Sequence, residues 1–289
     1  MAQDNLAWQS KLVLLAVLPF AATEVLLACF GWATVSASVV IWTLGSSALL
    51  GLVTWRLRAA TPAAALTGAL ITASLMFSTV EAAHEPWHTA LIPVVAVSLL
   101  AFAATRMGRR KKEHLGTAEA RHGRSAAQVA ANLGMAALVA SEPVKIWLSD
   151  SRWLPLPAHS ATLMPAMAMA ALAEAAADTV SSEIGQVLGG RPRMITTLRA
   201  VEPGTDGAVS LVGSLAGVVA AGIVAGAGTW ALRGDWSLFT LSCAGAVFGL
   251  FFDSLLGATF ERQGWLNNDA VNFLSTASAA AFAFVLLTL

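Results

Sequence analysis

Two aspartates that follow long apolar runs carry the strongest chemical signal in this chain. Asp178 comes directly after the Ala-rich segment 160–177, and Asp253 follows the apolar residues 246–252, with Gly249 and Gly257 one helical turn to either side. Each could be a solvated helix cap or half of a buried ion pair, but carboxylates within membrane spans usually mark functional sites. Two aspartates on separate helices suit Mg²⁺ that bridges phosphate oxygens.

The second signal is a polar block, residues 178–210, that is rich in Gly, Thr and Arg. Its segment 203–207 (Pro-Gly-Thr-Asp-Gly) precedes an apolar run, and it is either a turn in which Asp or Thr caps the next helix or a nest of N–H groups that binds phosphate. Neighbouring cationic and hydroxyl side chains favour phosphate: Arg191, Arg193, Thr196, Thr197 and Arg199. The glycines at 185–191 lack the Lys-Ser/Thr ending of a P-loop, which excludes a P-loop nucleoside triphosphatase.

Further polar residues recur at helical spacing, each set on one helix face. These sets are Gln128 and Asn132; Glu174, Asp178 and Ser182; Gly245, Gly249, Asp253 and Gly257; and Asn268, Asn272 and Thr276. All of them fall near the ends of apolar segments. Whether they meet depends on how those segments cross the membrane.

The composition predicts an all-α polytopic membrane helical bundle. The chain is 57% hydrophobic and 12% charged, and its mean hydropathy is +0.70. Since a membrane span needs about 20 apolar residues, we expect nine transmembrane helices, at 12–30, 37–55, 63–80, 89–105, 126–144, 160–177, 209–231, 237–258 and 270–289. Both cysteines fall in spans, which argues against a disulfide framework or a thiolate metal site. We expect one integral membrane domain over 1–289, with plain helices in 1–105 and the catalytic part in 106–289.

Charge distribution predicts that the N-terminus is cytoplasmic. Of the 17 lysines and arginines, only Lys145, Arg152 and Arg233 then lie outside, as the positive-inside rule requires. The most basic inside loop, 106–124, is expected to lie against anionic lipid. In this topology every polar set lies at the cytoplasmic face. We therefore expect a cytoplasm-facing active site in a bacterial-type cytoplasmic membrane, and no cleavable signal is evident.

The segment His84-Glu85-Pro86-Trp87-His88 matches the H-E-x-x-H pattern of zinc proteases. That pattern needs a regular helix to place both imidazoles on one face, and Pro86 disrupts such a helix. The segment also falls in an outside loop. An N-terminal cap for the fourth span is the better interpretation, and an intramembrane zinc protease is the weakest of the hypotheses.

Four blocks, taken in order, resemble the transmembrane protein 19 and phytyl-phosphate kinase family of integral membrane proteins. The resemblance is clear from about residue 106 to the C-terminus. The blocks are Arg124 with Gln128-Val129-x-x-Asn132; Ala177-Asp178-Thr179-x-x-Ser182-Glu183-Ile184-Gly185; Ile195-Thr196-Thr197 with Val201-x-Pro203-Gly204-Thr205-x-Gly207-x-Val209-Ser210; and Asp253-Ser254-Leu255-Leu256-Gly257-Ala258 with Asn268-Asp269-x-Val271-Asn272.

The resemblance implies a nucleotide-dependent transfer. The plant member of that family phosphorylates phytyl phosphate to phytyl diphosphate. Some elements are also similar to those of dolichol kinases and CDP-diacylglycerol synthases, which use CTP. This chain departs from the family in two ways: it shows no plastid leader, and Ser125 follows Arg124 where Asn or Asp is expected.

The resulting hypothesis is a Mg²⁺-assisted kinase that uses a nucleoside triphosphate, with CTP preferred, and an isoprenoid monophosphate lipid. Asp178, Asp253 and Arg193 would be catalytic, and Asp178, Glu183, Asp253 and Asp269 would bind the metal. The residues expected to bind nucleotide or phosphate are Arg124, Gln128, Asn132, Ser182, Arg191, Thr196, Thr197, Gly204, Thr205, Gly207, Ser210, Asn268 and Asn272. The partners would be this lipid, the nucleotide and membrane lipids, with no nucleic acid; a homodimer is left open. The alternative is a transporter of an anionic lipid or phosphorylated small molecule, which would bind through the same arginines without reaction.

Overall fold

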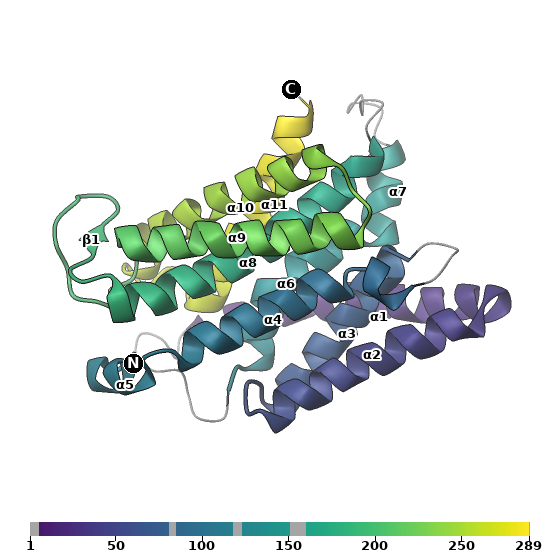
Figure 1. Ribbon diagram of the computed structural model, residues 1–289, viewed down its shortest axis with the longest axis horizontal. Helices are drawn as coiled ribbons and strands as arrows, with labels where there is room; N and C mark the ends of the chain where they lie inside the picture. Colours follow the sequence, from purple (N-terminus) through teal and green to yellow (C-terminus); the bar gives the residue numbers. More distant parts are fainter. Residues whose placement is uncertain (1–5, 81–84, 118–122, 151–159, 289) are drawn as a thin grey trace.

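Helices form wherever the sequence predicted an apolar span. The computed structural model describes residues 6–80, 85–117, 123–150 and 160–288. Its elements are α1 (Ala7–Val35), α2 (Ala37–Arg56), α3 (Pro62–Ser78), η2 (Pro86–His88), α4 (Leu91–Arg106), α5 (Arg109–Leu115), α6 (Ala126–Ala140), α7 (Glu142–Asp150), α8 (Ser160–Leu188), β1 (Arg193–Met194), β2 (Ala208–Val209), α9 (Leu211–Ala231), α10 (Trp236–Leu256), η3 (Gly257–Glu261) and α11 (Asn268–Thr288) (Figure 1). The predicted all-α class is confirmed. The two strands form only a short antiparallel hairpin.

Helix length and hydropathy confirm a polytopic membrane protein. Six helices of the described residues are long and apolar enough to cross a membrane: α1, α2, α8, α9, α10 and α11. A seventh span arises if α4 and α5, which meet at a bend of 65°, are taken together. The apolar helices α3 and α6 are shorter, with 17 and 15 residues. Nine crossings with a cytoplasmic N-terminus therefore stay a prediction.

Two boundaries differ from those predicted. α6 ends at Ala140 rather than at residue 144, because Ser141 takes an extended conformation and α7 begins at Glu142. α8 does not end at residue 177 but continues to Leu188. Asp178 and Ser182 therefore lie within a continuous helix, so the first third of the polar block is helical.

Several helix starts are fixed by side chains that cap the first turn, as short polar residues do. Thr61 accepts from the Ala64 amide before Pro62 opens α3, and Ser125 forms a reciprocal capping box with Gln128 at the start of α6. Asp235 caps α10 through the Leu238 amide at 3.0 Å. The starts of α3, α6 and α10 are thus held by hydrogen bonds.

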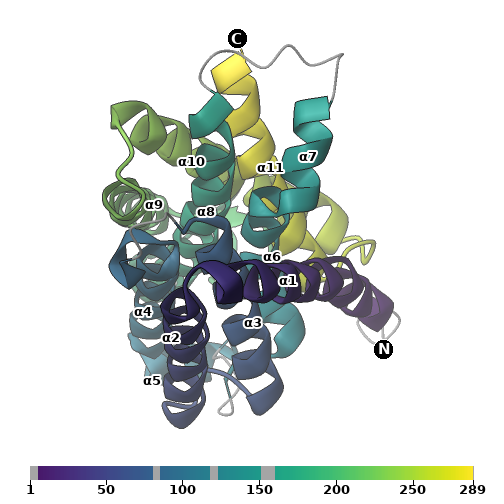
Figure 2. The same ribbon diagram turned by 90° about the vertical axis from the view of Figure 1, so that its right-hand side faces the viewer.

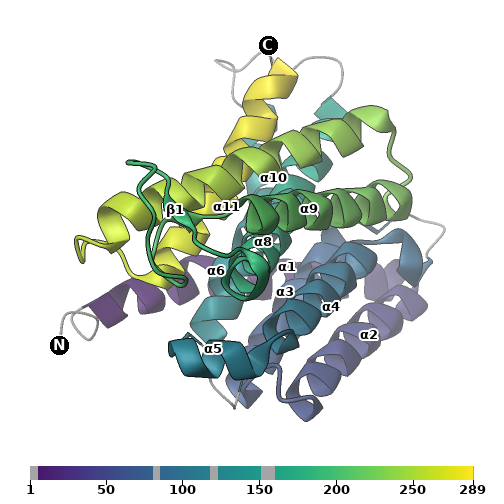
Figure 3. The same ribbon diagram turned by 60° about the vertical axis from the view of Figure 1, so that its left-hand side comes forward.

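α8 is the central helix of the bundle, with α9 and α10 on one side and α4 on the other (Figures 1 and 3). Its many alanines are buried, which permits close approach from several neighbours. Gly213 and Gly217 of α9 lie so close to α8 that a Cβ atom there would come within 2.8 Å of backbone carbonyl oxygens of Ser181 and Ala177, respectively. Helix packing therefore explains this small-residue pattern.

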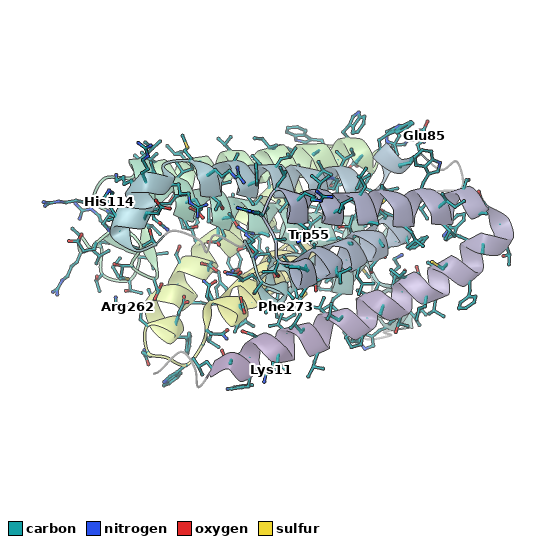
Figure 4. The ribbon with its side chains drawn as sticks, turned by 90° about the horizontal axis from the view of Figure 1, so that it is seen from below. Lys11, Trp55, Glu85, His114, Arg262 and Phe273 are labelled. Carbon is teal, nitrogen blue, oxygen red and sulfur yellow. The ribbon has the colours of Figure 1, made fainter. Side chains whose placement is uncertain are left out.

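The helix ends gather at two opposite ends of the bundle. Figure 4 shows His114 and Arg262 toward one end and Glu85 at the other. At the first end, the Gln9 side chain of α1 donates to the Trp265 carbonyl before α11, at 2.8 Å. The end that holds the start of α1 also holds the ends of α4, α8 and α10 and the start of α6. α2 and α3 lie at the lower side of the bundle (Figure 2).

Candidate active site

A polar cavity of about 360 Å³ lies at the bundle end that holds the start of α1. Its walls come from α6, α8, the loop before β2, the α10–η3 junction and the start of α11. The structure therefore brings together polar residues from several separate parts of the chain. Of the residues predicted for the site, the following line it: Arg124, Gln128, Asn132, Asp178, Ser182, Glu183, Gly204, Thr205, Gly207, Ser210, Asp253, Asn268 and Asn272.

Asp178 of α8 and Asp253 of α10 form the acidic centre of this cavity. Both carboxyl groups line the cavity, and they interact electrostatically with each other. Asp253 Oδ1 is buried, and it has no hydrogen-bond partner among the described residues. A buried carboxylate oxygen without a donor is costly. The pair is therefore placed to receive a ligand that supplies positive charge or hydrogen bonds.

A third acidic group, Glu174, lies one helical turn before Asp178 in α8. It is 1% exposed, and its Oε1 atom is buried without a hydrogen-bond partner among the residues described. Gly249 of α10 makes room for it, since a Cβ atom at position 249 would lie 2.5 Å from Glu174 Cγ. Gly249 thus serves the close packing of α10 on this glutamate.

Arg124 is the basic residue of the cavity wall, and no other Arg or Lys of the described chain lines it. Its backbone is fixed before α6, because its N–H donates to the Ala59 carbonyl and its carbonyl accepts from the Thr61 N–H, both at 3.0 Å. Its guanidinium lies 3.4 Å from Thr179 Oγ1 and interacts electrostatically with Asp178. A cation in this position can neutralise phosphate charge beside the aspartates.

The loop at Gly204–Gly207, called the glycine loop below, closes one side of the cavity. Gly204 and Gly207 adopt left-handed conformations, with φ of 88° and 73°. A side chain at Gly204 would clash with Thr117, and one at Gly207 would clash with the backbone of Ala258. Only glycine lets the loop lie this close to the α10–η3 junction.

The capping residue of α9 differs from the one predicted. Ser210, rather than Asp206 or Thr205, caps the helix by accepting from the Gly213 amide at 3.1 Å. The Thr205 hydroxyl instead donates to the Glu202 carbonyl at 2.7 Å. Asp206 therefore stays available beside the cavity. Burial raises the pKa of the Asp206 carboxyl, and the nearby Arg262 partly offsets this effect.

Five residues predicted for the site do not line the cavity: Arg191, Arg193, Thr196, Thr197 and Asp269. Successive side chains of a strand point to opposite faces, and in β1 Met194 is buried while Arg193 is exposed. Arg193 donates to the Leu198 carbonyl across its own turn at 2.8 Å. In this structure Arg193 therefore does not reach the cavity, and its catalytic role stays a prediction.

Two predicted metal ligands have other partners. The Asp269 carboxylate accepts a hydrogen bond of 2.6 Å from Ser10 of α1. Glu183 lines the cavity but forms an ion pair with Lys112 and accepts from Thr105. Asp269 joins α11 to α1 instead of reaching the cavity, and Glu183 holds α5 to α8.

The predicted site set omits several residues of the cavity wall: Thr117, Thr179, Ser181, Gly185, Gln186, Asp206, Ser254, Gly257 and Glu261. Gln186 continues the four-residue step from Ser182, so its position was readable from the sequence. Glu261 was not, because the π-helical turn η3 carries it back toward the cavity. There it is close to Asn268 and interacts electrostatically with Asp178.

The donor set fits Mg²⁺ only if a substrate supplies part of the coordination. Among the residues described, no three His, Cys, Asp or Glu side chains are grouped closely enough to hold a metal ion alone. Mg²⁺ is commonly bound by one or two carboxylates together with waters and substrate phosphates. The unpartnered Asp253 oxygen beside Asp178 matches that mode.

The H-E-x-x-H segment lies at the opposite end of the bundle. His84 lies outside the described residues. Pro86–His88 forms a short 3₁₀ turn, Glu85 pairs with Arg233 at 2.8 Å, and His88 Nδ1 lies 3.1 Å from the Ala231 carbonyl oxygen. Glu85 and His88 therefore connect this segment to the end of α9. The cap of α4 is Ala90, without a side-chain hydrogen bond.

Comparisons with known proteins agree with this architecture. The family model described as integral membrane protein DUF92 matches residues 45–280. An uncharacterized membrane protein of Synechocystis, sll0875, is 32% identical over 208 residues, which are 68% of this chain and 73% of that protein. No solved structure matches the chain.

Two other relatives match over smaller shares of their length. The uncharacterized membrane protein MJ0933 of Methanocaldococcus jannaschii is 44% identical over 108 residues, which are 37% of this chain and 45% of that protein. The chloroplastic protein VTE6 of Arabidopsis thaliana is 29% identical over 196 residues, which are 67% of this chain and 57% of that protein. The matched part thus spans about half the length of these two relatives.

Proposed function

The chain belongs to the DUF92 family of integral membrane proteins, and we propose that it transfers a phosphoryl group from a nucleoside triphosphate to an isoprenoid monophosphate. The relationship to VTE6 supports a membrane protein related to phytyl-phosphate kinase. One observation carries the proposal: Asp178 and Asp253 converge in a cavity with Arg124 and the glycine loop. CTP is the preferred donor, because the sequence blocks are similar to those of CTP-dependent lipid kinases.

The chemistry asks for positioning and charge neutralisation. The acceptor is a phosphate oxygen that is already ionised at neutral pH, so a strong general base is not needed. Arg124 would hold a phosphate, and the backbone N–H groups of the loop at Gly204–Gly207 would bind another. Asp178 and Asp253 would hold Mg²⁺, which when bound offsets the negative charge of the phosphates.

We also assign this reaction to the cytoplasmic face of a bacterial-type membrane. The positive-inside distribution of Lys and Arg supports this side, since α1 begins at the bundle end that holds the cavity. A nucleotide from the cytoplasm would then reach the cavity directly. The acceptor lipid would enter from the bilayer.

The test is nucleotide turnover by detergent-purified protein. Geranyl, farnesyl, geranylgeranyl and phytyl monophosphate are each combined with Mg²⁺ and CTP, ATP, GTP or UTP, and the prenyl diphosphate is quantified. Product from the wild type but not from Asp178→Asn or Asp253→Asn supports the kinase. Asp269→Asn is the matched control, because this aspartate lies at the same bundle end but does not line the cavity.

A folded wild type that makes no diphosphate and consumes no nucleotide across the panel would overturn the kinase. The transporter hypothesis would then be tested with the same phosphates in proteoliposomes.

A further inference from the structure

A second cavity, of about 120 Å³, lies between α2, α3, α4 and α6. Along α4 its wall extends from Val94 to Thr105, roughly 16 Å at 1.5 Å per residue. Most of its wall is aliphatic or aromatic, with Leu50, Val97, Phe102, Val129 and Leu133 among the lining residues. It therefore extends along the helices that line it.

The hydroxyl groups in this wall are already satisfied. Thr54, Thr72 and Ser98 donate to carbonyls of their own helices, at 2.9, 2.7 and 2.9 Å. They therefore offer mainly hydrocarbon surface to an occupant. Such a wall suits an apolar chain better than a polar molecule.

One end of the cavity is basic. Arg58, Arg106, Arg109 and Arg124 line it beside Thr105. This end belongs to the same bundle end as the polar cavity, and Arg124 and Asn132 line both cavities. This apolar cavity, called the slot below, has a cationic end. It is therefore complementary to a molecule that joins a hydrocarbon tail to an anionic head.

Gly68 leaves space open in the slot, although the packing of the helices does not require a glycine at this position. A Cβ atom at Gly51 would lie 2.8 Å from the Ala65 carbonyl oxygen, so Gly51 serves the contact of α2 with α3. At Gly68 the nearest atom to an added Cβ is Val129 Cγ1, at an ordinary 3.6 Å. Gly68 can therefore accept a side chain without a backbone clash, and that side chain would fill the slot.

We propose that this slot binds the isoprenoid tail of the acceptor lipid, and that Arg124 holds the lipid phosphate where the two cavities meet. The inference rests on the proposed function. It adds a location for the tail and names α3, α4 and α6 as the elements that set chain-length preference. Arg124 would then contact the phosphate of the acceptor lipid and also line the cavity that holds the nucleotide.

The location of the tail can be tested without turnover. Purified full-length protein in nanodiscs is photolysed with farnesyl monophosphate that carries a diazirine at the tail end, and the labelled peptides are identified by mass spectrometry. Label on α3, α4 or α6 that excess farnesyl monophosphate displaces, and phosphatidylglycerol does not, supports the slot. Label confined to α9, α10 or α11, or displaced equally by phosphatidylglycerol, overturns it even if the kinase activity is present.

Substitution of Gly68 provides the second test. Gly68→Leu should raise the KM for farnesyl monophosphate at least tenfold and leave the KM for dimethylallyl monophosphate and for the nucleotide unchanged. Gly222→Leu is the matched control, because an added Cβ there meets nothing within 4 Å. Equal effects on both chain lengths, or none, would overturn the slot. If Gly68→Leu does not fold, Val129→Phe fills the slot from α6.

The two failures are distinguishable. A wild type that is labelled in the slot but makes no diphosphate would leave the lipid site standing and refute the kinase. A wild type that makes diphosphate but is labelled elsewhere would refute only the slot.

Discussion

Lys112 of α5 forms an ion pair with Glu183 of α8 from a position that is 1% exposed. Its ammonium also donates to the carbonyls of Ala104 and Thr105, at 3.0 and 2.7 Å. All three donors of the lysine are thus used. This arrangement fixes the basic helix α5 beside the polar cavity, and it assigns a structural partner to a glutamate that the sequence suggested as a metal ligand.

We expect Lys112→Met to destabilise the protein by about 3–5 kcal/mol, because removal of one partner leaves a poorly solvated carboxylate without its counter-charge. The measurement is the unfolding of detergent-purified protein, followed by circular dichroism. Arg109→Met is the control: its pair with Glu113 is solvent-exposed, so its loss should cost at most about 1 kcal/mol. If Glu183→Gln lowered Mg²⁺ affinity without an effect on stability, the structural assignment would be wrong.

Asp253 and Asp269 should differ sharply in their effect on turnover. Asp253→Asn removes charge from the acidic pair, and we expect turnover to fall by at least about 100-fold, as for loss of a preorganised electrostatic group. Asp269→Asn weakens only the hydrogen bond with Ser10, so we expect a stability loss of about 1 kcal/mol and little change in rate.

Mg²⁺ titration of the two variants completes the comparison. The concentration of Mg²⁺ needed for half-maximal turnover should stay at the wild-type value for Asp269→Asn. An equal loss of turnover in both variants would contradict the cavity as the site of reaction.

The sequence predicted the fold class and the convergence of polar residues because both depend on periodicity and membrane length. Asp178, Asp253 and Asn272 lie on helices, where spacing determines the face, and they line one cavity. Arg193 was expected near the phosphates but lies outside the cavity, because its exposure depends on the register of a two-residue strand. Glu261 was missed because a π-helical turn has no readable signature in its spacing from Asp253. Long-range pairs such as Ser10 with Asp269 were equally inaccessible from one sequence.

Gly207 gives a test of the loop geometry. Gly207→Ala combines a left-handed backbone penalty of about 1–2 kcal/mol with a clash against Ala258, so we expect the loop to shift and the KM for nucleotide to rise. Gly190→Ala is a matched control in the same polar block. It has a φ of 65°, and an added Cβ there meets nothing within 4 Å.

Both substitutions carry the backbone penalty, so their difference isolates the contact with Ala258. Nucleotide KM measured at saturating lipid is the readout. An identical KM in the two variants would indicate that the loop does not help to shape the nucleotide site.

Substitutions of Arg124 and Arg193 test whether the functional arginine lies in the cavity or in the exposed hairpin. Arg124 lines both cavities and interacts with Asp178 and Thr179. Arg193, by contrast, is exposed and donates a hydrogen bond to the Leu198 carbonyl. We expect Arg124→Gln to lower kcat/KM for the lipid phosphate by at least about 100-fold, because a charge-assisted contact to phosphate is lost. Arg193→Gln should leave the rate within about threefold, as for an exposed polar contact. Arg124→Lys should restore only part of the activity, since an ammonium keeps the charge but not the planar fork that binds two phosphate oxygens. If Arg193→Gln proved as damaging as Arg124→Gln, the hairpin would have to fold over the cavity during turnover, and the arginine predicted from the sequence would act there after all.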